Sequence, residues 1–474
     1  MATDAKPQMI GLWMTTALVV GTIIGSGIFM LPVALAPLGP NALIAWIVSG
    51  IGVICIAYAM GRLSKLGGEG IQANVEKEFG PTAGFLVAWS FWASNATGQG
   101  AVAVAAASAM SFVSPALVRP DNIVAVAIGW LVVLTAVNAL GVRAAGGFSV
   151  VTVLIKLLPL LAVVWIFGER SATGGSFEPL TPSPINVTNL AAATALTFFA
   201  FTGFEAATTP VGKVRNPERT LPRALIGGVT FTVLLYLVAG TAIQMLLPAD
   251  VVAASPAPFA DALTSRFGSG AATFAALTIA VAAVGCLNGL ILATGELGYS
   301  MALRGDMPKA MGWTRGVNTP VVAQIVGSAI SALVLLANSS KATANLYTFI
   351  ILLGTASVVI VYLAATLGAW RHSPGTGQRA ILALALSFIA FATYGIGMEP
   401  VLWSLVLLAI GIAIRGIMHW LESRAGSSPP AAASPAAPPG SAASASAKNC
   451  AGTPRWSPAV RPHSSATACR AAPA

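Results

Sequence analysis

The residues that could do chemistry in this chain lie inside long apolar stretches. The first group is Gly-Thr-Ile-Ile-Gly-Ser-Gly-Ile-Phe at 21–29, with Gly21, Gly25, Ser26 and Gly27 within seven residues. A helix interrupted there would present free N–H groups and the positive end of a half-helix dipole, which together favour an anion such as a carboxylate. The alternative is that these small residues allow close packing of a neighbouring helix.

A second interruption is predicted at 197–206, Thr-Phe-Phe-Ala-Phe-Thr-Gly-Phe-Glu-Ala, where Gly203 stands two residues before Glu205. Glu205 either responds to protons or accepts hydrogen bonds from Thr208, Thr209 or a neighbouring helix. If spans one to five and six to ten are repeats, the two interruptions fall at corresponding positions. Paired interruptions are the best sequence indication of a transporter's binding site.

Lys156 lies at the centre of another apolar stretch. A lysine there costs ~2.5–3.5 kcal/mol on insertion scales, so we expect it to face the interior of the helix bundle. It either carries a proton or serves as a structural ammonium bonded to the carbonyls of the broken helices. Glu296 lies eight residues before Arg304, near the predicted inner loop, and a solvated role is expected for it.

The elements that position these residues must be membrane helices. Hydrophobic types make up 56% of the 474 residues and charged types 8%, with a mean hydropathy of +0.82. A soluble domain carries about 25% charged residues, so this chain must place its surface in lipid. A soluble multidomain enzyme is excluded. The net charge of +10 is typical of basic inner loops, and no nucleic-acid partner is expected.

Windows poor in charge predict twelve spans. They lie within 7–61 (two spans, joined near Pro37 to Pro40), 79–118, 122–142, 144–168, 186–212, 224–249, 268–303, 320–337, 345–370, 380–396 and 401–420. With both termini inside, the only basic residues in outer loops are Arg119, Arg170, Arg266 and Lys341. This asymmetry supports the twelve-span topology with cytoplasmic N- and C-termini.

We therefore expect a transporter domain at 7–424 and a disordered tail, rich in Ala, Pro and Ser, at 425–474. The four cysteines, Cys55, Cys286, Cys450 and Cys469, have no metal-ligand spacing, so neither a disulfide framework nor a metal site is predicted. No cofactor is expected. A membrane-embedded enzyme is disfavoured because the deep ionisable residues are few, lie on separate spans and include no histidine.

The sequence resembles bacterial amino acid permeases of the amino acid–polyamine–organocation superfamily, and most nearly their basic amino acid/polyamine antiporter branch. The resemblance rests on residues 21–29, on Phe-Thr-Gly-Phe-Glu at 201–205, on Asn-Pro-Glu-Arg-Thr-Leu-Pro-Arg at 216–223, and on Arg-Gly-Asp-Met-Pro at 304–308 with Thr-Pro at 319–320. It implies an all-α membrane protein whose five-plus-five inverted repeat, with helices 1 and 6 broken, carries two further helices and works by alternating access.

The resemblance also implies a set of substrate contacts. The substrate carboxylate would meet the amides of Gly25, Ser26 and Gly27. Its α-amino group would meet carbonyls near Ile23, Phe199 and Thr202, with the Phe199 ring closing over the pocket. Gln99 is a further candidate contact, and Leu290 replaces a tryptophan that stacks on a guanidinium in the arginine/agmatine exchangers. Proton coupling would fall on Lys156 and Glu205, which makes sodium coupling unexpected.

Because Phe199 and Leu290 replace two tryptophans of that branch, the chain loses a cation–π contact worth ~0.5–2 kcal/mol. The sequence therefore favours a proton-linked permease for neutral, apolar amino acids in the inner (cytoplasmic) membrane, surrounded by lipid. A homodimer is compatible with the sequence. The alternative is an amino acid/amine exchanger or exporter. The two differ in whether transport requires substrate on the opposite side of the membrane.

Overall fold

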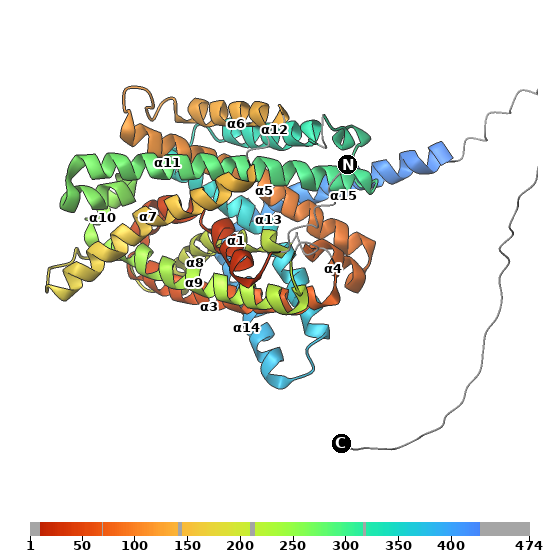
Figure 1. The fold of residues 1–474 in the computed structure, drawn as a ribbon, viewed down its shortest axis with the longest axis horizontal. Coiled ribbons are helices and arrows are strands. Elements are labelled where there is room, and N and C mark those ends of the chain that lie inside the picture. Colours follow the sequence, from red (N-terminus) through yellow and green to blue (C-terminus); the bar gives the residue numbers. More distant parts are fainter. Residues whose placement is uncertain (1–9, 69, 141–144, 209–213, 316–318, 427–474) are drawn as a thin grey trace, which may run out of the picture. The chain divides into compact units, whose positions relative to one another are not determined.

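The computed structural model describes residues 10–68, 70–140, 145–208, 214–315 and 319–426, with the backbone alone described at 145–154, 422, 425 and 426. The predicted tail beyond 426, the first nine residues and Thr209 lie outside these ranges. Residues up to Ala425 belong to one compact unit. Helices dominate it, and the described residues form isolated β-bridges but no strand (Figure 1).

The helices follow one another with short connections, as the charge-poor windows predict. The α-helices are α1 (Leu12–Ile23), α2 (Gly27–Leu35), α3 (Pro40–Leu63), α4 (Gly70–Phe79), α5 (Pro81–Val113), α6 (Ile123–Ala139), α7 (Ala145–Ala172), α8 (Val187–Phe201), α9 (Pro217–Leu246), α10 (Ala249–Ala254), α11 (Pro258–Leu303), α12 (Val321–Ala337), α13 (Thr343–Arg371), α14 (Thr376–Ile396) and α15 (Met398–Gly426). The 3₁₀ turns are η1 (Ala36–Leu38), η2 (Ser64–Leu66), η3 (Phe204–Thr208) and η5 (Lys309–Gly312).

Local residue types set several helix boundaries. Pro40, Pro81, Pro217 and Pro258 occupy the first turn of α3, α5, α9 and α11, where a missing N–H costs nothing. Within α11, Gly268 has φ 78° and ψ 177°, which breaks the helical path. This break lies at the residue where the predicted span 268–303 begins.

Eight helices in the described part of the chain are long and apolar enough to cross a membrane, and the bent pair α1/α2 would add a ninth. The shorter apolar helices α6 and α12, and α7 with its partly undescribed side chains, would complete the predicted twelve. The protein is thus a multi-pass helical membrane protein. The exact number of spans stays a prediction.

The helices form two groups. In one, α1, α3, α8 and α9 pack together; in the other, α5, α6, α11 and α12 do, with α6 and α12 side by side along one edge (Figure 1). Helix α7 bridges the groups by contacting α9 and α11, and α13 bridges them by contacting α3, α5 and α8. Helix α14 covers α8 and α13 from outside. The broken helix α1/α2 therefore lies where α8, α9, α11 and α13 converge.

Beyond the end of α11, Asp306 forms an ion pair with Arg415 of α15. The carboxylate lies 2.8 Å from Arg415 Nε, and the two side chains are only 10% and 16% exposed. The guanidinium also stacks over the Phe85 ring, 4.8 Å from its centroid. This cluster fixes the peripheral helix α15 to the loop after α11 and to α5.

Asp306→Asn should destabilise the fold, because it leaves the guanidinium of Arg415 largely buried without a counter-charge. We expect the free energy of unfolding to fall by about 1–3 kcal/mol, less than for a fully buried pair. Thermal unfolding in detergent measures the change. Asp121→Asn is the control, since it removes the exposed Arg119–Asp121 pair, whose side chains are 62% and 70% exposed, and should have no measurable effect. Equal effects of both substitutions would contradict the prediction.

Candidate functional site

The first predicted interruption is present. Helix α1 ends at Ile23, α2 begins at Gly27, and the axes of Leu12–Ile23 and Gly27–Leu38 differ by 41°. Ile24 between them is extended, with φ −71° and ψ 90°. The chain leaves the helical path here because two glycines and a serine stabilise a helix poorly. Sequence reasoning therefore predicted both the place and the nature of this break.

The break leaves hydrogen-bonding groups free. Within the described residues, the amides of Gly25, Ser26 and Gly27 donate no hydrogen bond to the protein. The hydroxyl of Ser26 is also buried without a partner, although this residue is only 3% exposed. Three free N–H groups and a hydroxyl at the start of a half-helix form an environment suited to a carboxylate.

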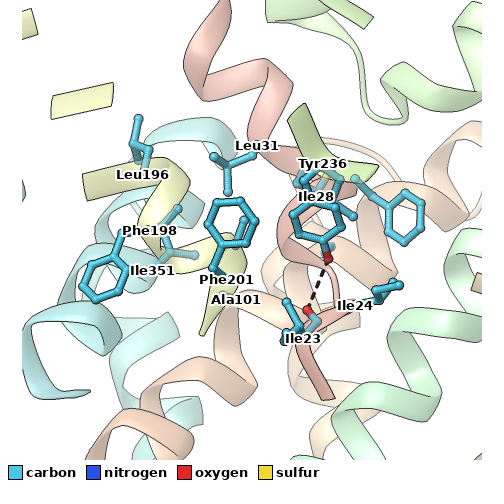
Figure 2. Packing of buried hydrophobic residues seen from close by; sticks show 14 of the residues in the cluster. Ile23, Ile24, Ile28, Leu31, Ala101, Leu196, Phe198, Phe201, Tyr236 and Ile351 are labelled. Atoms are coloured by element: carbon cyan, nitrogen blue, oxygen red, sulfur yellow. Dashed lines mark hydrogen bonds between the residues drawn. The ribbon is translucent and has the colours of Figure 1, made fainter. Parts of the chain in front are cut away.

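Two tyrosines from distant helices donate to carbonyls of the same break. The Tyr236 hydroxyl of α9 donates to the Ile23 carbonyl at 3.3 Å (Figure 2). The Tyr347 hydroxyl of α13 donates to the Ser26 carbonyl at 3.5 Å. The Tyr236 ring stacks on Phe201 at 5.4 Å, so it is held from α8 as well. The carbonyl of Ile23, a predicted partner of the substrate amino group, is thus already engaged.

Tyr236→Phe should weaken substrate binding moderately. The ring keeps its stacking on Phe201, but the end of α1 loses one hydrogen bond worth about 1 kcal/mol, so we expect KM for transport to rise about fivefold. Initial rates in proteoliposomes measure KM. Tyr394→Phe on α14, where the side chain is 62% exposed, is the control and should leave KM unchanged. An unaltered KM in the Tyr236 variant would exclude this hydroxyl from the site.

The second predicted interruption is present as well. Helix α8 ends at Phe201, Thr202 is extended with ψ 157°, and Gly203 has φ +112°, a value that side-chain-bearing residues rarely adopt. The chain then forms η3 rather than a regular α-helix. The Thr202 amide and hydroxyl both donate to the Phe199 carbonyl, at 3.0 and 2.8 Å. In the described part of the chain no group donates to the Thr202 carbonyl.

Glu205 accepts hydrogen bonds from its own break and from a neighbouring helix, which is one of the partners that the sequence left open. Its carboxylate is 2.9 Å from the Gly203 amide and 2.7 Å from the Tyr362 hydroxyl of α13, and the residue is only 3% exposed. The Thr208 hydroxyl donates instead to the Glu205 backbone carbonyl. The carboxylate therefore holds the second break in shape and ties it to α13. Its role in proton coupling stays a prediction.

The two breaks touch each other. A Cβ on Gly27 would lie 3.2 Å from Ala200 Cα, and a Cβ on Gly203 would lie 2.6 Å from the Thr22 carbonyl oxygen. Both contacts exist only because these positions lack side chains. The free amides of the first break and the free Thr202 carbonyl of the second therefore belong to one region.

That region retains accessible surface inside the helix bundle. Gly25, Phe199, Thr202 and Gly203 are partly exposed, although α8, α9, α11 and α13 surround them. Phe199 approaches the first break, since its Cε1 would lie 3.5 Å from a Cβ on Gly27. This position suits the predicted aromatic gate.

The other predicted residues differ in their exposure and in whether their polar groups already have partners. The amide of Gln99 is already engaged, because Nε2 donates to Thr294 at 2.9 Å and Oε1 accepts from Ser328 at 3.2 Å. Leu290 is partly exposed, and Glu296 is exposed, in agreement with a solvated role. Lys156 is 5% exposed, and nothing in the described residues bonds to its ammonium.

Sequence reasoning missed the three tyrosines that contact the breaks, namely Tyr236, Tyr347 and Tyr362. A signal existed, since each is a polar hydroxyl inside an otherwise apolar span and such a group needs a partner when buried. The sequence alone gives no indication of which partner each one finds.

The sequence profile of the family described as amino acid permease matches residues 15–417. This chain belongs to the amino acid permease family. The match covers both breaks, all three tyrosines and Lys156, so the geometry above is that of an amino acid permease.

Relatives of this permease are transporters of amines. It is similar to the cadaverine/lysine antiporter of Escherichia coli K12, with 30% identity over 353 residues, which are 72% of this chain and 78% of that protein. It is also similar to the putrescine transporter PotE of Haemophilus influenzae, with 25% identity over 88% of this chain and 98% of that protein. PotE of Escherichia coli K12 is likewise 25% identical, over 88% of this permease.

Proposed function

We propose that this permease is a secondary active antiporter of the cytoplasmic membrane that exchanges a basic amino acid for a related amine. The predicted alternative, an amino acid/amine exchanger, has more support than proton-linked uptake of neutral amino acids. The support comes from relatives whose names refer to cadaverine, lysine and putrescine. Neutral, apolar amino acids are therefore not proposed as the main substrates.

The observation that carries the proposal is the set of free amides at Gly25, Ser26 and Gly27 beside the free carbonyl of Thr202. The amides suit the carboxylate of an amino acid, and the carbonyl suits an ammonium group. An amine that lacks the carboxylate would use only the carbonyl part of the site. One site can thus bind both partners of an exchange. The amides bind the carboxylate while the amino acid is carried, and they stay without a ligand while the amine is carried.

Alternating access around this site requires the predicted five-plus-five repeat. Three helix pairs support it, because α3 packs on α9, α5 on α11 and α6 on α12. These are the second and seventh, third and eighth, and fourth and ninth predicted spans. Corresponding helices of two repeats that share an axis are expected to meet in this way. We propose the twelve-span topology on this basis, and both termini in the cytoplasm because most basic residues fall in the predicted inner loops.

The test is exchange in proteoliposomes loaded with lysine, cadaverine or nothing, with labelled cadaverine or lysine outside. We expect uptake only into loaded vesicles. Labelled leucine is the second arm and should not be exchanged. Uptake of leucine into empty vesicles under an imposed pH gradient would overturn the antiporter proposal and restore the neutral amino acid permease.

A further inference from the structure

Cys286 exposes part of its surface to the inside of the helix bundle. On α11, Leu277 is 46% exposed and Val281 is 45% exposed, so they mark the outer face of this helix. Cys286 lies nine residues after Leu277, and Leu290 lies nine residues after Val281. Nine residues are two and a half turns at 3.6 residues per turn, so Cys286 and Leu290 face away from the outer surface. Both are nevertheless partly exposed.

The thiol of Cys286 lies against the first break. Its sulfur would be 3.3 Å from a Cβ on Gly25, the residue whose amide is free. The next residue, Ser26, holds the buried hydroxyl that has no partner in the described ranges. The free Gly25 amide, the buried Ser26 hydroxyl and the partly exposed Cys286 thiol thus lie at the same break. Buried polar groups without a protein partner are the groups that internal water and polar ligands satisfy.

We propose that Cys286 forms part of the wall of a water-accessible space at the first break, and that a group attached to its thiol blocks transport. The blocking step rests on the proposed antiporter function, whereas the accessibility of the thiol does not. The ligand class is a small, water-soluble, soft electrophile. Cys55 offers a matched comparison, because it is an apolar-span cysteine that is buried.

The probe is [2-(trimethylammonium)ethyl] methanethiosulfonate, a permanently charged reagent that does not enter lipid. The thiolate sulfur of Cys286 attacks the sulfenyl sulfur of the reagent, a disulfide forms, and methanesulfinate leaves with the electron pair of the broken S–S bond. The proton of the thiol passes to water. Dithiothreitol reverses the modification, which separates blockage from damage to the fold.

The experiment uses the full chain with Cys450→Ser and Cys469→Ser, in which Cys55 and Cys286 remain. Mass spectrometry follows the modification of each cysteine with time. We expect Cys286 to react at least about tenfold faster than Cys55, because reactivity follows exposure to water. Equal or slower reaction of Cys286 would overturn the proposal, whatever the protein transports.

The second measurement compares exchange with the occupancy of Cys286. In the variant that also carries Cys55→Ala, exchange should fall in proportion to modification and recover with dithiothreitol. The exchange activity that the Cys286→Ala variant retains should not change when the reagent is added. Full modification with undiminished exchange would overturn the blocking role. Absence of exchange before any treatment would instead count against the antiporter function, while the ratio of reaction rates would still decide the accessibility of Cys286.

Discussion

Gly203→Ala is expected to lower the exchange rate by about 100-fold, because a strained φ and a backbone clash together cost a few kcal/mol and each 1.4 kcal/mol is a factor of ten. Gly203 has φ +112°, and its new methyl group would lie 2.6 Å from the Thr22 carbonyl oxygen. Backbone cannot yield as a flexible side chain can, so the two breaks must separate. Initial rates of labelled exchange, normalised to reconstituted protein, measure the loss.

Gly129→Ala is the matched control. It also places a methyl group on a glycine, but this position lies in α6 with nothing within 4 Å of the new Cβ. We expect unchanged exchange and an equal or higher thermal midpoint, since alanine favours helix. If the Gly203 variant unfolds below the assay temperature, binding of lysine to the variant at low temperature decides the question. Wild-type exchange or wild-type lysine affinity in the Gly203 variant would show that the contact between the breaks is dispensable.

The places where the chain departs from regular helix were predictable, because the signal is local. Glycines in 21–29 and at 203 weaken the helix wherever they lie. The break at Gly268 falls where the charge-poor window at 268–303 begins. Proline at the first turn likewise acts within a few residues. Charge-poor windows predicted most helix boundaries to within a few residues.

Contacts between distant helices were not predictable. Tyr236 donates to Ile23 across 213 residues of sequence, and Tyr362 donates to Glu205 across 157. A single sequence does not tell which span packs on which. The interpretation of Glu205 therefore named nearby threonines or an unspecified neighbouring helix. In the structure that helix is α13, whose Tyr362 hydroxyl donates to the carboxylate, and the Gly203 amide donates to it as well.

The substrate class was drawn from two replaced tryptophans, at Phe199 and Leu290, and the relatives favour amines instead. The physical reason is that the energy of the lost contact is small. One cation–π contact is worth ~0.5–2 kcal/mol, which alters affinity but does not decide between charged and apolar ligands. Free carbonyls and hydroxyls near the breaks offer an ammonium group other partners of similar strength.

Lys156→Ala is expected to abolish accumulation driven by a pH gradient, if Lys156 couples protons to exchange. Lys156 lies on α7, a helix that contacts α9, α11 and α1, and the residue is 5% exposed with no bond among the described residues. A lysine at membrane depth without a partner costs ~2.5–3.5 kcal/mol. Because no described residue holds the ammonium, we expect its charge to act in proton coupling, as the sequence predicts. Lysine-loaded proteoliposomes with labelled cadaverine outside and an imposed pH gradient measure the accumulation.

Thermal stability separates the two roles of Lys156. If the ammonium stabilises the broken helices, Lys156→Ala should lower the midpoint of unfolding; if it couples protons, the midpoint should stay or rise, because an unpaired buried charge is removed. We expect the midpoint of unfolding to stay or rise. We also expect the Lys156→Ala variant to keep exchange when the pH is equal on both sides of the membrane. Lys65→Ala, at an exposed position in η2, is the control for loss of a positive charge. Unchanged gradient-driven accumulation in the Lys156 variant would remove Lys156 from the mechanism, because the proton would then have to travel through another group, with Glu205 next to be tested.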